Sequence, residues 1–222
     1  MARASFWILL TTGLLAGALF LLPRYLGPPQ LGQAIAAVVG LYLVVLYFGA
    51  WLRSQHELLD AFAFLVPLSV FQVLPDLMLV QQLGTLVFPA LGAQGFGPVP
   101  VYMAGLWVAP LLVVLWLAEV AHRASAVTAA IVALLAALAV FGAAEWAAAH
   151  VLPLWQPRRV ETWQGIALYV LPAEALLGLV AWLVFTQVQH RTLFAKVFGA
   201  AIVALFYTGA LFASHLAFQR YF

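Results

Sequence analysis

The sequence contains no cysteine and very little charge. Its 222 residues include nine Lys and Arg and seven Asp and Glu, so that only 7% of the chain is charged. The lack of cysteine excludes disulfides, cysteine metal sites and thiolate nucleophiles. Soluble domains are charged at about a quarter of their positions, so the composition excludes a soluble globular protein. The scattered basic residues form no run that could follow a phosphate backbone, and we expect no nucleic acid partner.

Hydrophobic residues, by contrast, make up 67% of the chain. A bilayer core about 30 Å thick needs about 20 apolar residues per helix, and the sequence holds seven such runs. It therefore predicts an all-α polytopic membrane protein whose single transmembrane domain covers residues 1–222. The predicted helices span residues 5–23, 31–52, 58–80, 98–121, 125–148, 161–187 and 194–217.

The distribution of Lys and Arg between the two sides of the membrane predicts the orientation, because cytoplasmic loops carry more basic residues. One side holds Arg3, Arg53, Arg123, Arg191 and Lys196, and the other holds Arg24, Arg158, Arg159 and Arg220. The small excess on the first side favours a cytoplasmic N-terminus. We expect an integral protein of a bacterial inner membrane.

Two stretches of the chain, residues 74–107 and 143–174, follow the same pattern. Each has an acid near the end of one span, a loop containing proline, a glycine, and a tyrosine that opens the next span. The acids are Asp76 and Glu145, the tyrosines are Tyr102 and Tyr169, and the same short distance beyond each tyrosine come Trp107 and Glu174. The pattern predicts an internal repeat of two helices, and functional sites in membrane proteins commonly lie where such repeats meet.

Three acids fall within the predicted spans at a distance from basic residues. An ionisable group in a span costs several kcal/mol unless it is neutral, paired or facing a cavity. Asp76 and Glu145 would lie toward the ends of their spans, whereas Glu174 would lie about 20 Å into a helix that starts near residue 161, close to the midplane. We predict that the three acids face one cavity, and that Glu174, lacking a cationic partner, keeps its proton and donates it.

Two further residues of the predicted sixth span bear on its shape. Pro172 removes a backbone donor, so a kink is expected there. Gly178 lies about one turn beyond Glu174, and its lack of a side chain is expected to leave room for a ligand.

The second stretch resembles the membrane-integral lycopene cyclase domain, a family of small carotenoid cyclases, over residues 143–182. The similarity lies in "AEWAAAHVLPLWQP" and "QGIALYVLPAEALLG", in the order Glu145, Trp155, Gly165, Pro172, Glu174. The sequence departs from the family pattern at two positions. Glu145 stands where the family has aspartate, and Ala175 stands where it has a second acid.

The resemblance implies roles for the three acids. Glu174 would be the catalytic acid and Glu145 its partner, while Asp76 corresponds to them only through the internal repeat. In such a reaction a carboxylic acid protonates a terminal double bond, a second double bond attacks the carbocation, and a base removes a proton. No metal or other cofactor is required, and the ligand is an apolar isoprenoid or another lipid. Because Ala175 removes one carboxyl group, both the substrate and the presence of catalysis stay open.

Aromatic residues are the expected lining of such a site, because their faces stabilise cations and tryptophan does so best. We expect substrate contacts from Tyr102, Trp107, Trp146, Trp155, Trp163, Tyr169 and Trp182.

Other functions are compatible with the same sequence. The short loops suit a non-catalytic subunit that binds pigment or lipid, or an assembly partner in an oligomer or larger complex. The three acids could instead form the relay of a proton-coupled carrier. A retinal protein would need Lys196, the only lysine, which is expected near the membrane surface. His150 could assist Glu145, and His215 could ligate the metal of a pigment.

Overall fold

The computed structural model describes the backbone of residues 5–221 and the side chains of residues 5–219. Arg3 lies outside the described residues, and only the backbone of Arg220 is described. Of the described residues, 76% are helical. Within the described part, seven helices are long and apolar enough to cross a membrane, which confirms the predicted all-α polytopic membrane protein.

Five of the described spans are single helices, and the third and fourth are each built from consecutive helical segments. The first two are α1 (Ser5–Tyr25) and α2 (Pro28–Leu52). The third consists of α3 (His56–Phe71), α4 (Val73–Leu77) and the π-helix η2 (Met78–Leu83), and the fourth consists of α5 (Met103–Leu106) and α6 (Val108–His122). The last three are α7 (Ala126–His150), α8 (Val170–Val188) and α9 (Leu193–Tyr221).

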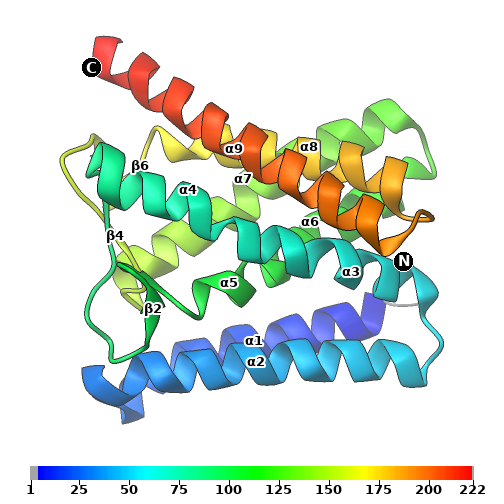
Figure 1. Ribbon diagram of the computed structural model, residues 1–222, viewed down its shortest axis with the longest axis horizontal. Coiled ribbons are helices and arrows are strands. Elements are labelled where there is room, and N and C mark those ends of the chain that lie inside the picture. Colours follow the sequence, from blue (N-terminus) through cyan, green and yellow to red (C-terminus); the bar gives the residue numbers. More distant parts are fainter. Residues whose placement is uncertain (1–4, 222) are drawn as a thin grey trace.

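The helices run side by side, with all the short strands gathered at one end of the bundle (Figure 1). We call this the strand end. The α1–α2 pair lies along one edge, and α8 and α9 lie along the opposite edge (Figure 1). The third, fourth and sixth spans are the most buried, whereas α1 and α7 are the least buried. The lipid-facing surface is accordingly apolar, and the internal contacts concentrate around α3, α6 and α8.

The third span becomes irregular as it approaches the strand end. Pro75 has no backbone N–H to continue the helix, and the chain passes from α3 through the short α4 into the π-helix. Gly84 then ends the span in the left-handed conformation, with φ of 63°. Asp76 directly follows this proline, so that the irregular backbone carries the acid into the protein interior.

The loops at the strand end have matching structures. Strand β1 (Leu86–Val87) in the first loop pairs antiparallel with β4 (Gln156–Pro157) in the second. Each loop then forms a hairpin, β2 (Gly95–Phe96) with β3 (Val99–Pro100), and β5 (Thr162–Trp163) with β6 (Ile166–Ala167). Tyr102 and Tyr169 follow their hairpins at the same spacing and lead into the next helix. This arrangement follows the internal repeat predicted from the sequence.

The hairpins explain why two spans begin later than predicted. Residues 98 and 161 were expected to start helices, but the fourth and sixth spans begin at Met103 and Val170. Glu174 therefore lies only about 6 Å along α8 and not near its middle. Pro172 falls in the first turn of α8, where the backbone N–H has no partner within the helix, so the expected kink has no cause.

Gly178 serves helix packing and not ligand binding. A Cβ atom at this position would lie 2.3 Å from the Cβ of Ala137 and 3.0 Å from the backbone oxygen of Ala133, both on α7. The missing side chain thus lets α7 and α8 approach closely, as small residues do between membrane helices.

Replacing Gly178 should therefore weaken the fold. Gly178→Ala should lower the free energy of unfolding by about 1–3 kcal/mol, because α7 and α8 must move apart to admit the methyl group. The matched control is Gly209→Ala in α9, where an added Cβ has nothing within 4 Å. Unfolding with SDS in detergent micelles, followed by tryptophan fluorescence, measures both variants. Equal stabilities would show that the α7–α8 contact is looser than described.

Candidate functional site

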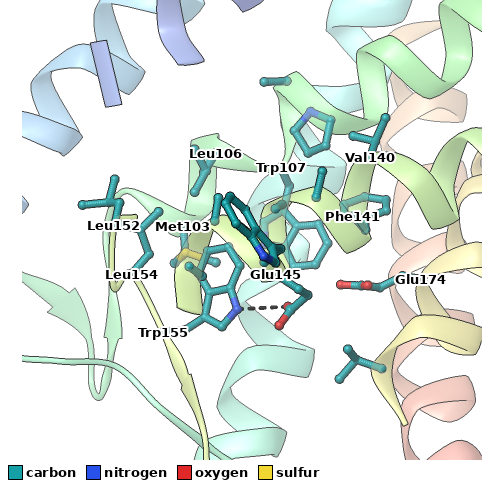
Figure 2. Close-up of a pocket in the computed structure, with 18 of the residues that line it drawn as sticks. Met103, Leu106, Trp107, Val140, Phe141, Glu145, Leu152, Leu154, Trp155 and Glu174 are labelled. Carbon is teal, nitrogen blue, oxygen red and sulfur yellow. Dashed lines mark hydrogen bonds between the residues drawn. The ribbon is translucent and has the colours of Figure 1, made fainter. Parts of the chain in front are cut away.

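The three acids that the sequence predicts to lie together all line one cavity of about 590 Å³ near the strand end. Asp76 reaches it from α4, Glu145 from α7 and Glu174 from α8. Figure 2 shows the carboxyl groups of Glu145 and Glu174 facing the same space. Asp76 and Glu174 are buried, whereas Glu145 is partly exposed.

The acids interact with one another and not with a cation. Glu174 is close enough to both Asp76 and Glu145 for their charges to repel, and Asp76 in turn interacts with Glu145. Among the residues that line the cavity there is no lysine, arginine or histidine. Ionising the three carboxyl groups together would therefore place like charges in an apolar space without compensation.

Only part of the carboxyl hydrogen-bonding capacity is used. The indole Nε1 of Trp155 donates to Oε1 of Glu145 at 2.9 Å (Figure 2). Within the described chain, Oε2 of Glu174 and Oδ2 of Asp76 are buried with no hydrogen-bond partner. Trp107 lies beside Asp76, yet its Nε1 also has no partner of good geometry. Such atoms are costly to bury, and a functional role is one of the reasons for which proteins retain them.

Aromatic rings form one wall of the cavity. Trp107 packs against Phe141, with ring centroids 5.4 Å apart, and against Tyr207 of α9, at 5.8 Å. Tyr207 is buried and lies close enough to interact electrostatically with all three acids. Neither Phe141 nor Tyr207 was predicted from the sequence. The hydroxyl of Tyr207 in an otherwise apolar span is the only local signal that could have suggested it.

The predicted aromatic lining divides into two groups. Trp107, Trp146, Trp155 and Tyr169 line the cavity. The other three lie elsewhere. Trp163 is 60% exposed on β5, Trp182 donates to Oε1 of Glu119 at 3.1 Å farther along α8, and Tyr102 packs beneath the loops.

The two loops close the cavity at the strand end. A tyrosine from each repeat forms a hydrogen bond with the loop of the other repeat. The hydroxyl of Tyr169, from the second repeat, shares a hydrogen bond of 2.8 Å with Thr85 in the first loop. The hydroxyl of Tyr102, from the first repeat, donates to the backbone oxygen of Leu154 in the second loop at 3.4 Å. The backbone N–H of Arg158 adds a bond of 2.8 Å to the oxygen of Thr85, extending the β1–β4 pairing.

The remaining candidate groups lie outside the cavity. His150 stacks on Trp146, with centroids 4.9 Å apart, and its Nδ1 contacts the backbone oxygen of Trp146 and not Glu145. The ring of His215 packs edge-on against the ring of Tyr169, with ring centroids 5.2 Å apart. Lys196 is paired with Asp60 near the end of the bundle opposite the strands. The described residues include no group of three or more His, Asp or Glu side chains placed to hold a metal ion.

Comparison with known families finds a match, which covers most of the cavity lining but not the part contributed by α1. Residues 73–218 match the family described as "Domain of unknown function (DUF6989)". The match covers more than half of the chain, which therefore belongs to this family. The matched region contains all three acids, whereas α1, α2 and α3 precede it. Neither a curated protein nor a solved structure matches the chain.

The hydrogen bond between the hydroxyl groups of Tyr169 and Thr85 should contribute to the stability of the fold. Tyr169→Phe should lower the free energy of unfolding by about 1 kcal/mol, since the buried hydroxyl of Thr85 loses its shorter hydrogen bond and keeps only the 3.5 Å bond to the backbone oxygen of Leu79. In a double-mutant cycle, Thr85→Val should cost little once Tyr169→Phe is present. SDS unfolding of the four proteins in micelles gives the coupling energy. Additive losses would mean that the two hydroxyl groups do not interact in the folded protein.

Proposed function

We propose that this family member is a membrane enzyme in which the protonated carboxyl group of Glu174 starts carbocation chemistry on an apolar isoprenoid. The observation that carries the proposal is the unpartnered Oε2 of Glu174, buried at the edge of an apolar, aromatic-walled cavity. We further propose that the protein resides in a bacterial inner membrane with its N-terminus in the cytoplasm.

Glu174 is the best suited of the three acids to donate a proton. It is 3% exposed, no basic side chain lines the cavity, and both other acids repel its charged form. The neutral carboxylic acid is therefore the favoured state in the absence of ligand. An alkene placed against this group replaces no strong hydrogen bond to Oε2, because Oε2 makes none with the described residues.

Glu145 is the better candidate for the base. It accepts the hydrogen bond from Trp155, which stabilises a carboxylate more than a carboxylic acid. Asp76 lies beside Trp107 with its own Oδ2 unpartnered, and it serves as a second proton-holding group.

The proposed reaction is redox-neutral. The proton of Glu174 adds to one carbon of an alkene, and the electron pair of that double bond forms the new C–H bond. A second double bond attacks the resulting cation to form a C–C bond, and Glu145 removes a proton from a carbon next to the new cation. Substrate and product are isomers, and one proton passes between the two acids. Trp107, Phe141 and Tyr207 present the aromatic faces that would stabilise the cation.

The resemblance to membrane-integral lycopene cyclases fits this proposal, despite the missing acid at residue 175. Ala175 does not line the cavity, whereas Glu174 does. An alanine there removes no carboxyl group from the cavity described here. The proposed chemistry needs only a donor and a base, and both are present.

A second candidate is a non-catalytic subunit that binds a lipid or pigment. It is favoured by the composition of the cavity, whose lining is almost entirely apolar and would hold a hydrocarbon without reacting. Protein purified from membranes would then carry a stoichiometric, chemically unchanged lipid or pigment, detectable by absorbance and mass spectrometry. In that case Glu174→Gln should leave the bound molecule in place and unaltered.

The enzymatic proposal predicts a specific loss. Incubated with isoprenoid polyenes such as squalene and lycopene, the wild type should form products of unchanged mass and altered retention in liquid chromatography–mass spectrometry. Glu174→Gln should reduce product formation by at least about 100-fold, because the amide cannot protonate the alkene. The matched control is Glu119→Gln, which alters an acid bonded to Trp182 outside the cavity and should retain activity.

Two results would refute the proposal. One is isomerisation by Glu174→Gln at the wild-type rate. The other is a folded wild type that converts no isoprenoid in the panel and releases only unreacted lipid, which would favour the binding subunit.

A further inference from the structure

We infer that the ligand enters this cavity sideways from the bilayer, through an opening between α1 and α7. The inference rests on the proposed function in one respect, namely that the cavity receives an apolar isoprenoid. It adds the route of entry and the part of the ligand that reaches Glu174.

The exposure of the lining residues locates the opening. Among the described residues that line the cavity, the exposed ones are Ala16 and Phe20 on α1, and Ala143 and Trp146 on α7. Phe20 and Trp146 are each nearly half exposed, at 46% and 45%. All four lie within segments long and apolar enough to span a membrane, which is why we place this opening in the bilayer, toward the end of α1 where the Arg24 guanidinium lies 4.5 Å from the ring centroid of Phe20.

The strand end offers no comparable opening. The loop residues that line the cavity are all buried or only partly exposed. The β1–β4 pairing and the Tyr169–Thr85 hydrogen bond hold the two loops together across this end. A ligand arriving from water would have to part these contacts, whereas one dissolved in the bilayer meets an existing gap.

The attachment of α1 explains how this gap is kept. At the end away from the strands, α1 is fixed to α6 by the hydrogen bond of 2.9 Å from Trp116 to Ser5. Near that end it is also fixed to α2, where Trp7 packs so closely on Gly49 that no Cβ would fit. Toward the strand end, both α1 and α7 line the cavity, and the small side chains of Ala16 and Ala143 leave room for a chain at its mouth.

The order of the acids from the mouth inward suggests which end of the ligand reacts. Glu145 is partly exposed and adjoins Trp146 at the mouth, whereas Asp76 and Glu174 are buried. A chain entering between α1 and α7 therefore passes Glu145 before its leading end reaches Glu174. The ligand class that fits is a linear isoprenoid whose reactive double bond lies at its hydrocarbon terminus.

The absence of cysteine from the sequence permits a clean test, because one introduced thiol is then unique. Ala143→Cys is modified with benzyl methanethiosulfonate in detergent after folding, so that the added ring blocks the mouth of a native protein. The protein is returned to phosphatidylcholine vesicles containing a geranylgeraniol analogue with a diazirine at its hydrocarbon end. Brief irradiation followed by peptide mass spectrometry gives the rate at which the segment around Glu174 becomes labelled.

Blocking the mouth should slow this labelling by at least about tenfold, because a chain cannot share so narrow a space with the added ring. Dithiothreitol removes the ring and should restore the rate. The matched control is Ala139→Cys, one turn earlier on α7, exposed but not lining the cavity. On α1, modified Ala16→Cys should slow the labelling as Ala143→Cys does. Its control is Gly17→Cys, at an exposed position that does not line the cavity, where modification should leave the labelling rate unchanged.

The outcomes separate the two proposals. Rapid labelling near Glu174 that persists with both mouth positions blocked would overturn the lateral route while leaving the cavity as a lipid site. If the unmodified protein shows no labelling near Glu174, the cavity takes no such ligand, and the proposed function fails together with the route. Slowing at both mouth positions but at neither control position would establish the opening.

Discussion

The architecture of the strand end depends on the cost of holding three carboxyl groups in an apolar environment without a cation. An isolated charge there is far more expensive than in water, and each neighbouring acid adds repulsion. The fold limits this cost in two ways: the three groups line one cavity in place of being packed tightly among apolar side chains, and one indole donates a hydrogen bond to Glu145, the acid nearest the mouth. The irregular third span, the paired loops and the aromatic wall all serve this arrangement.

The helical part of the fold was predictable from composition alone, because a bilayer requires long apolar segments and the sequence holds seven. The starts of the fourth and sixth spans were not. Segments such as Val99–Pro100 and Ile166–Ala167 are apolar and continue the hydropathy of the helix that follows, yet they form hairpin strands. Their conformation depends on turns with positive φ, at Gly97 (64°) in the first hairpin and at Gln164 and Gly165 (50° and 79°) in the second, and on loops that meet only in the folded chain.

The acids of the site were predictable for a related reason. Charge is so rare in these spans that Asp76, Glu145 and Glu174 stand out individually. Aromatic residues do not stand out, because the same side chains also face lipid and the membrane surface. Position along one helix could not separate Trp155, which meets Glu145, from Trp163, which lies exposed on a hairpin. Tyr207 and Phe141 join the site only through the packing of α7 and α9 around α6, which no local pattern encodes.

The two repeats differ at the position where each next helix meets the cavity, since Trp107 in one corresponds to Glu174 in the other and both line the same cavity. Helix α1 is related to the cavity in a different way. This helix forms one wall of the cavity, yet it precedes the region that defines the family. Under the proposed function, substitutions in α1 would reshape this wall of the cavity without changing any of the three acids.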